Sequence, residues 1–154
     1  MAVYSFLNIR ASITGPGGAF SLGAGSANAE EGITTSYVSE KNTMTIGADG
    51  SGMHSLRASN AGKITVRLLK TSPVNAQLSA LFRFQKANAA LWGQNVIVVS
   101  DTQRGDLCTG REVAFTKHPD LTYAVEGGNV EWEFDVVRLD ELLGAGIPDV
   151  NTGG

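Results

Sequence analysis

One ten-residue segment, residues 130–139, constrains the fold of this chain more than any other. It reads VEWEFDVVRL. Side chains of a β-strand point alternately to its two faces, so the four apolar residues at even positions share one face. The opposite face carries three carboxylates in a row, from Glu131, Glu133 and Asp135. The segment therefore predicts a strand of an antiparallel sheet that buries Val130, Trp132, Phe134 and Val136 and turns its other side to water.

Three interpretations of the acidic face stay open. It can be an ordinary solvated face, paired in part with Lys63 and Arg67 of a neighbouring strand. It can instead line a water-filled channel, where carboxylates repel passing anions. Alternate residues on one strand lie roughly 6.5–7 Å apart, so a hydrolase or metal site is the third interpretation. Hydrolases usually take their acid and base from different strands, however, and we expect neither catalysis nor a cofactor.

Most of the other segments also predict strands. Residues 5–14 alternate, with Leu7, Ile9, Ala11 and Ile13 on one face, and end at a Gly-Pro-Gly-Gly turn from which residues 19–22 return. Further strands are expected at 63–70, at 95–100, which is buried by composition, and at 107–118. With eight to ten strands and a high glycine content, the chain is predicted to be mainly β, as a sandwich or barrel.

A single helix is predicted over residues 73–88. Thr71-Ser72-Pro73 supplies a hydroxyl N-cap followed by proline at the first helical position. Val74, Leu78, Leu81 and Phe82 then form one apolar stripe. We expect this helix to cover an open face of the sheet.

Residues 23–62 contain few large apolar side chains. The segment is rich in Gly, Ser, Thr, Asn and Ala, with strands expected at 34–39 and 42–46 and a turn at 48–52. Forty residues with so little to bury are uncommon inside a compact domain. The segment is therefore either a mobile loop or an extended arm that is buried against another chain. In the second case the contacts come from Ile33, Tyr37, Val38, Met44, Ile46 and Met53.

Length and composition exclude several classes of protein. The 154 residues suit one domain with a polar tail at 144–154, and the net charge of −3 argues against a surface that grips nucleic acid. No apolar run approaches the ~18 residues of a membrane span. The first ten residues lack the pattern of a secretory signal, so we expect synthesis in the cytoplasm.

The remaining reactive side chains do not form a recognisable catalytic or metal motif. His54 and His118 lack metal-ligand spacing and are expected to be surface or loop residues. Cys108 is the only cysteine and is expected to be a small buried residue.

Three motifs together resemble the tail tube proteins of contractile-tailed bacteriophages. They are the strand end Ile13-Thr14-Gly15-Pro16-Gly17-Gly18, the helix start at 71–81 (TSPVNAQLSAL) and the turn and strand at 126–132 (EGGNVEW). The resemblance rests on their order and spacing and covers residues 4–143. Type VI secretion and pyocin tube proteins look like relatives of the same fold.

The resemblance implies a structural virion protein, made in the host cytoplasm and assembled as hexameric rings that stack into a tail tube. Viral DNA would pass through the lumen without specific binding, and the acidic row Glu131, Glu133 and Asp135 would face it. The implied partners are the sheath, tape measure, baseplate and terminator proteins, with no insertion into a membrane. The arm at 23–62 would reach a neighbouring subunit.

Two alternatives remain at this stage. The chain can be another tail component, such as a baseplate, terminator or sheath-associated protein. It can also be a carbohydrate-binding β-sandwich that uses Trp92 and Trp132, although Trp132 shares the apolar face and is expected in the core.

Overall fold

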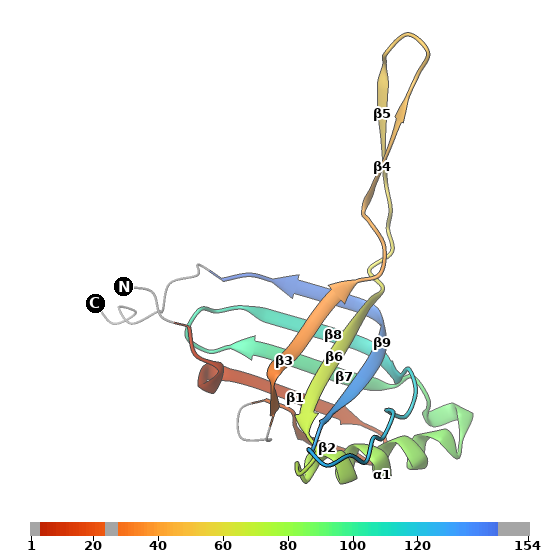
Figure 1. The fold of residues 1–154 in the computed structure, drawn as a ribbon. Helices are drawn as coiled ribbons and strands as arrows, with labels where there is room; N and C mark the ends of the chain where they lie inside the picture. Colours follow the sequence, from red (N-terminus) through yellow and green to blue (C-terminus); the bar gives the residue numbers. More distant parts are fainter. Residues whose placement is uncertain (1–3, 24–27, 145–154) are drawn as a thin grey trace.

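A single seven-stranded antiparallel sheet forms the body of the protein (Figure 1). The computed structural model describes residues 4–23 and 28–144, with the side chains of 28–31 left out. The strand order in the sheet is β2-β1-β7-β8-β9-β6-β3, and β4 and β5 pair only with each other. The bounds are β1 Ile9–Gly15, β2 Gly18–Ser21, β3 Asn28–Tyr37, β4 Asn42–Ile46, β5 Gly52–Leu56, β6 Gly62–Leu69, β7 Asn95–Asp101, β8 Leu107–Phe115 and β9 Asn129–Leu142.

One α-helix closes the sheet at its lower end in Figure 1. The helix α1 spans Val74–Lys86, and two short 3₁₀ turns, η1 (Phe6–Asn8) and η2 (Ala89–Leu91), flank other elements. The sheet curls so that β3 and β6 pass across β1 and β7. The predicted mainly-β, barrel-like fold with one flanking helix is confirmed.

The hydrophobic core fills the inside of this curl. It joins side chains from five strands with the apolar stripe of α1, where Val74, Leu78 and Leu81 point inward. The predicted two-faced strand is confirmed in β9, because Val130, Trp132, Phe134 and Val136 are all buried, together with Leu139. Removing this apolar area from water supplies most of the favourable free energy of folding, at about 25 cal/mol per Å².

A buried pair of amides fastens the helix to the sheet. Gln85 and Asn95 are both fully buried, and each side-chain amide donates to the other at 2.7 and 2.9 Å. Gln85 Nε2 also donates to the Pro16 carbonyl, and Asn95 Nδ2 to the Val113 carbonyl. A Cβ on Gly15 would lie 1.8 Å from Asn95 Oδ1, so the Gly-Pro-Gly-Gly turn is needed for close approach as well as for the reversal of the chain.

The structure corrects two details of the predicted strands. Residues 6–8 form η1 instead of the start of a strand, because the Ser5 hydroxyl accepts the Leu7 N–H and competes with sheet pairing. Leu7 is consequently exposed. The strand β7 is also less buried than its composition indicates, since the side chain of Val96 lies on the outer face of the sheet and is exposed.

A projecting arm is present, but the part that leaves the main sheet is shorter than the predicted 23–62. The strand β3 belongs to the main sheet, where it pairs with β6. Residues 38–61 then leave the sheet as a hairpin whose second strand, β5, the sequence did not predict. Residues 24–27 of the predicted arm and 145–154 of the predicted tail lie outside the described residues.

The amide pair generates a stability prediction. Gln85→Leu and Asn95→Leu should each lower the free energy of unfolding by about 1–3 kcal/mol, because each leaves buried polar partners unsatisfied. The double variant should lose less than the sum of the two, since the mutual hydrogen bonds disappear together. Urea denaturation of the four proteins measures this, with the exposed Gln77→Leu as a control for helix substitution. Strictly additive losses would contradict the coupling.

Candidate assembly surface

The acidic row of β9 lies directly opposite a basic row of β6. Their register pairs Asp135 with Lys63, Glu133 with Thr65 and Glu131 with Arg67. Directly opposed residues of an antiparallel pair share one face. Carboxylates and cations therefore occupy the same outer face of the sheet, as the solvated-face interpretation requires.

Two of the three carboxylates form ion pairs there. Lys63 Nζ lies 3.8 Å from Asp135 Oδ1, and Arg67 Nε lies 3.5 Å from Glu131 Oε2. Arg67 also donates to the hydroxyl of Thr34 on β3, at 2.9 Å. Such exposed pairs contribute only about 0–1 kcal/mol each to stability. Their main effect is on charge: this part of the face carries three negative and two positive groups instead of an uncompensated acidic stripe.

The hairpin β4–β5 stands alone in solvent above the sheet (Figure 1). At its base, Val38 N–H donates to Ala61 and Arg57 N–H to Lys41, which continues the ladder into the arm. At its tip, the Asp49 carboxylate accepts the backbone N–H of Ser51. Hydrogen bonds from the backbone and side chain of Ser51 lower the pKa of the Asp49 carboxyl. An isolated two-stranded hairpin is marginally stable in water. Among the described residues, β4 and β5 pair only with each other, so no further strand of that part of the chain stabilises this hairpin.

One face of the hairpin carries three large apolar side chains together with Asn42 and His54, and the other face is mainly polar. The register opposes Met44 to His54 and Asn42 to Leu56. Met44, Ile46 and Leu56 consequently share a face, and they are 60%, 56% and 87% exposed. The other face carries mainly hydroxyls, together with Met53. We call Met44, Ile46 and Leu56 the apolar stripe of the arm.

The structure separates the six residues expected to contact another chain. Ile33 lies in β3, opposite Val66, and packs against the core. Tyr37 ends β3, with the Lys41 ammonium 4.2 Å from its ring centroid, and Val38 is exposed beside it. Of the six, Met44, Ile46 and Met53 lie in the paired strands of the projecting hairpin, and Met53 is on the opposite face from the other two.

The sheet also leaves two edges open. The strands β2 and β3 stand at the ends of the strand order, and among the described residues neither pairs with a further strand. Unpaired backbone groups of an edge strand can pair with another chain. These edges and the apolar stripe are therefore the surfaces suited to self-assembly.

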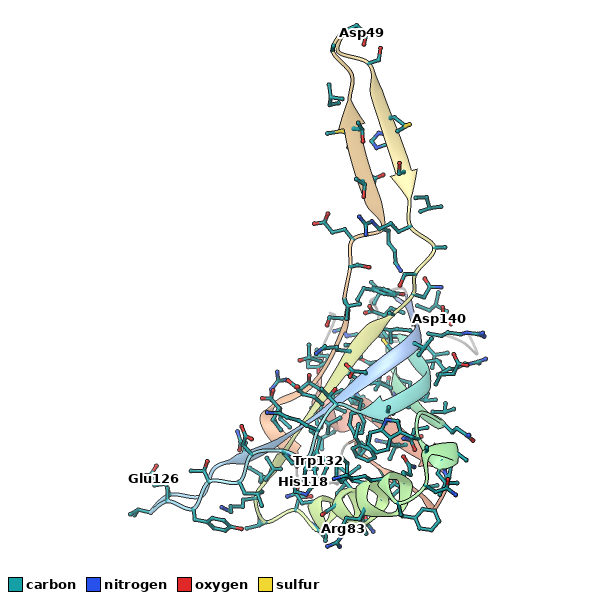
Figure 2. The ribbon with its side chains drawn as sticks, turned by 90° about the vertical axis from the view of Figure 1, so that its right-hand side faces the viewer. Asp49, Arg83, His118, Glu126, Trp132 and Asp140 are labelled. Atoms are coloured by element: carbon teal, nitrogen blue, oxygen red, sulfur yellow. The ribbon has the colours of Figure 1, made fainter. Side chains whose placement is uncertain are left out.

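The histidines and the cysteine do not come together. His54 lies on the hairpin against Asn42, while His118 packs edge-on against Phe82 and Trp132 at the other end of the subunit (Figure 2). Burial raises the pKa of the Cys108 thiol, against the opposing hydrogen bond with Thr35. Among residues 4–23 and 28–144, no three His, Cys, Asp or Glu side chains are grouped to hold a metal ion.

The two tryptophans do not form an exposed platform. Trp132 is buried, as expected, and its indole N–H donates to Asn75 Oδ1 at 3.0 Å. Trp92 is partly exposed and packs edge-on against Phe82. Phe82, Trp92, His118 and Trp132 form one aromatic cluster. The sequence did not predict it, because its members are far apart along the chain and no periodic pattern links them.

In the described part of the chain, no helix is both long and apolar enough to cross a bilayer.

Solved structures of contractile injection systems share this fold. A chain of the anti-feeding prophage baseplate, solved with six-fold symmetrisation, is similar with a TM-score of 0.59 and 10% identity, over 92% of this chain and 96% of the other. A chain of the anti-feeding prophage tube-terminating cap gives a TM-score of 0.52 at 12% identity, over 93% and 95%. A chain of the PVC sheath–tube complex in the extended state gives 0.50 at 11% identity, over 87% and 88%.

Sequence comparison identifies the family. No curated protein matches this chain. The family of the bacteriophage PhiTE tail tube protein matches residues 1–144, which is nearly the whole chain. The family match, the shared fold and the resemblance seen in the sequence agree, and the chain belongs to the bacteriophage PhiTE tail tube protein family.

Proposed function

We propose that this protein forms the inner tube of a phage tail by stacking hexameric rings, and that viral DNA passes through the tube during ejection. The observation that carries the proposal is the apolar stripe of the arm, which has no partner surface in the described part of its own chain. The family is one of tail tube proteins. A chain with the same fold comes from a baseplate that was solved with six-fold symmetrisation, and this supports the proposal of a hexameric ring.

The partners follow from a place in the tail. A sheath protein would surround the tube, as in the sheath–tube complex of which one chain shares this fold. A tape measure protein would occupy the lumen during assembly, and baseplate and terminator proteins would bind the two ends. The role is structural, without catalysis or a cofactor. Another tail component is the second candidate, since similar chains occur in a baseplate and in a cap. Short, closed rings that never extend into tubes would favour it.

The outer face of β9 and β6 is the proposed lumen wall, with Glu131, Glu133 and Asp135 facing the DNA. Lys63 and Arg67 share this face, so part of the proposed effect of the carboxylates is to form ion pairs with these two cations. A lysine or arginine held by a carboxylate is less able to take a DNA phosphate, and the remaining charge of the five groups is negative. Both effects disfavour adhesion of DNA.

The first prediction concerns assembly. Purified protein should form rings and tubes in negative-stain electron micrographs as its concentration rises. Met44→Ser with Ile46→Ser should abolish the tubes while leaving the unfolding midpoint of the subunit nearly unchanged, because both side chains are exposed in the subunit. Met53→Ser, on the other face of the same hairpin, is the matched control and should assemble. A wild-type protein that stays monomeric at high concentration would contradict the proposed function.

The second prediction concerns the lumen. Glu131→Gln with Asp135→Asn removes the carboxylates from Arg67 and Lys63, and changes the sum over these five groups from one negative to one positive charge. Assembled tubes of this variant should retain double-stranded DNA more strongly, by about tenfold at low salt, and lose it steeply as salt rises. DNA ejection from particles that carry the variant should be slower.

A charge-exchanged variant provides the control for the lumen. Lys63→Asp with Asp135→Lys keeps both the cross-strand ion pair and the net charge, so its DNA retention and ejection should match the wild type. Unchanged ejection from the neutralised variant, in tubes that assemble normally, would show that these residues do not face the DNA.

A further inference from the structure

An apolar groove lies at the end of the subunit opposite the hairpin. It is bounded by α1, η2 and residues 116–118, the segment that follows β8, and has a volume of about 730 Å³. Figure 2 shows His118 and Trp132 at this end and Asp49 at the far tip of the arm. The side chains that line it and matter here are Phe82, Lys86, Ala89, Trp92, Thr116 and His118.

One feature of the groove indicates that it is incomplete. Trp92 packs on Phe82 but leaves 36% of its own surface exposed, although a large aromatic side chain gains much of its stabilising free energy from burial. An occupant that brings apolar side chains would cover the indole.

The arm of another copy has this chemistry. Its stripe of Met44, Ile46 and Leu56 is apolar, and the polar groups of its backbone lie at the rims of a narrow hairpin. The flexible, polarizable thioether of methionine adapts well to aromatic surfaces. The five residues of β4 alone extend roughly 17 Å, and the hairpin projects well beyond the sheet (Figure 1). The stripe can therefore reach a neighbouring molecule.

The charges at the two ends are complementary. Lys86 borders the groove on α1, which contains no acidic residue, whereas the nearby Lys117 is already paired with Asp120 at 3.6 Å. The tip of the hairpin carries Asp49, which is exposed and whose lowered pKa keeps it ionised at neutral pH. Opposite charges at matching ends favour one orientation of docking and discourage the reverse.

We propose that the groove formed by α1, η2 and residues 116–118 receives the β4–β5 hairpin of a second copy of this chain. Donor and acceptor lie at opposite ends of the subunit (Figure 2), so the contact is heterologous and continues from copy to copy without closing. Such a contact lengthens a tube ring by ring. The inference rests on the proposed function and names the surface that receives the arm.

Disulfide trapping tests the contact directly. In a Cys108→Ser background, Ile46→Cys places one thiol on the apolar stripe and Ala89→Cys places one on the groove. The two proteins are mixed, assembled and mildly oxidised. A covalent dimer should appear on a non-reducing gel in the mixture and not in either protein alone. Val137→Cys, exposed on β9, replaces Ile46→Cys in a control mixture and should give no dimer.

The outcomes separate this inference from the proposed function. Tubes that assemble in the mixture without a covalent dimer would overturn the groove as acceptor and leave the tube intact. A wild-type protein that never assembles would overturn both. As a second measurement, Asp49→Lys should raise the protein concentration needed for tubes, and adding Lys86→Glu should restore it. Failure of that restoration, with normal folding of both variants, would contradict the pairing of these ends.

Discussion

The pairing of β9 between β8 and β6 is the constraint on which the rest of the structure depends. Residues 129–136 of β9 pair with β6, and residues 134–142 pair with β8. The period of two along the strand fixes what each face of the sheet contains. A shift of register by one residue would bury Glu131, Glu133 and Asp135 and expose Trp132 and Phe134. The hydrophobic core forbids that shift, so packing on the inside determines which charges meet on the outside.

Those charges change the account of how a tube wall would avoid DNA. A row of bare carboxylates repels phosphates directly, whereas the observed face combines carboxylates with cations on the neighbouring strand. The wall would then depend on ion pairs that contribute little to folding. Because exposed ion pairs contribute little to stability, the role proposed for them is to limit the access of DNA phosphates to Lys63 and Arg67.

The subunit has a well-packed core, whereas its arm, its groove and its two edge strands leave apolar or backbone polar groups exposed. The amides of Gln85 and Asn95 tie the helix to three other elements, while the arm is held by one ladder only. Apolar side chains on that arm, a partly open groove at the far end and two free sheet edges are all costs for an isolated molecule. In the proposed tube they would become contacts between copies, which would explain why they coexist with a well-packed core.

Alternation and turn chemistry were sufficient to predict β9, β6, the β1–β2 hairpin and α1, because each depends on a local pattern that burial then reinforces. The acidic face was likewise visible in the sequence. Its pairing with Lys63 and Arg67 was not decided there, since it required the register between strands 60 residues apart. The same is true of the contact of Ile33 with the core, of the two faces of the arm and of the apolar groove formed by α1, η2 and residues 116–118. Contacts between distant segments are set by how the sheet curls and packs, and only the tertiary structure contains that information.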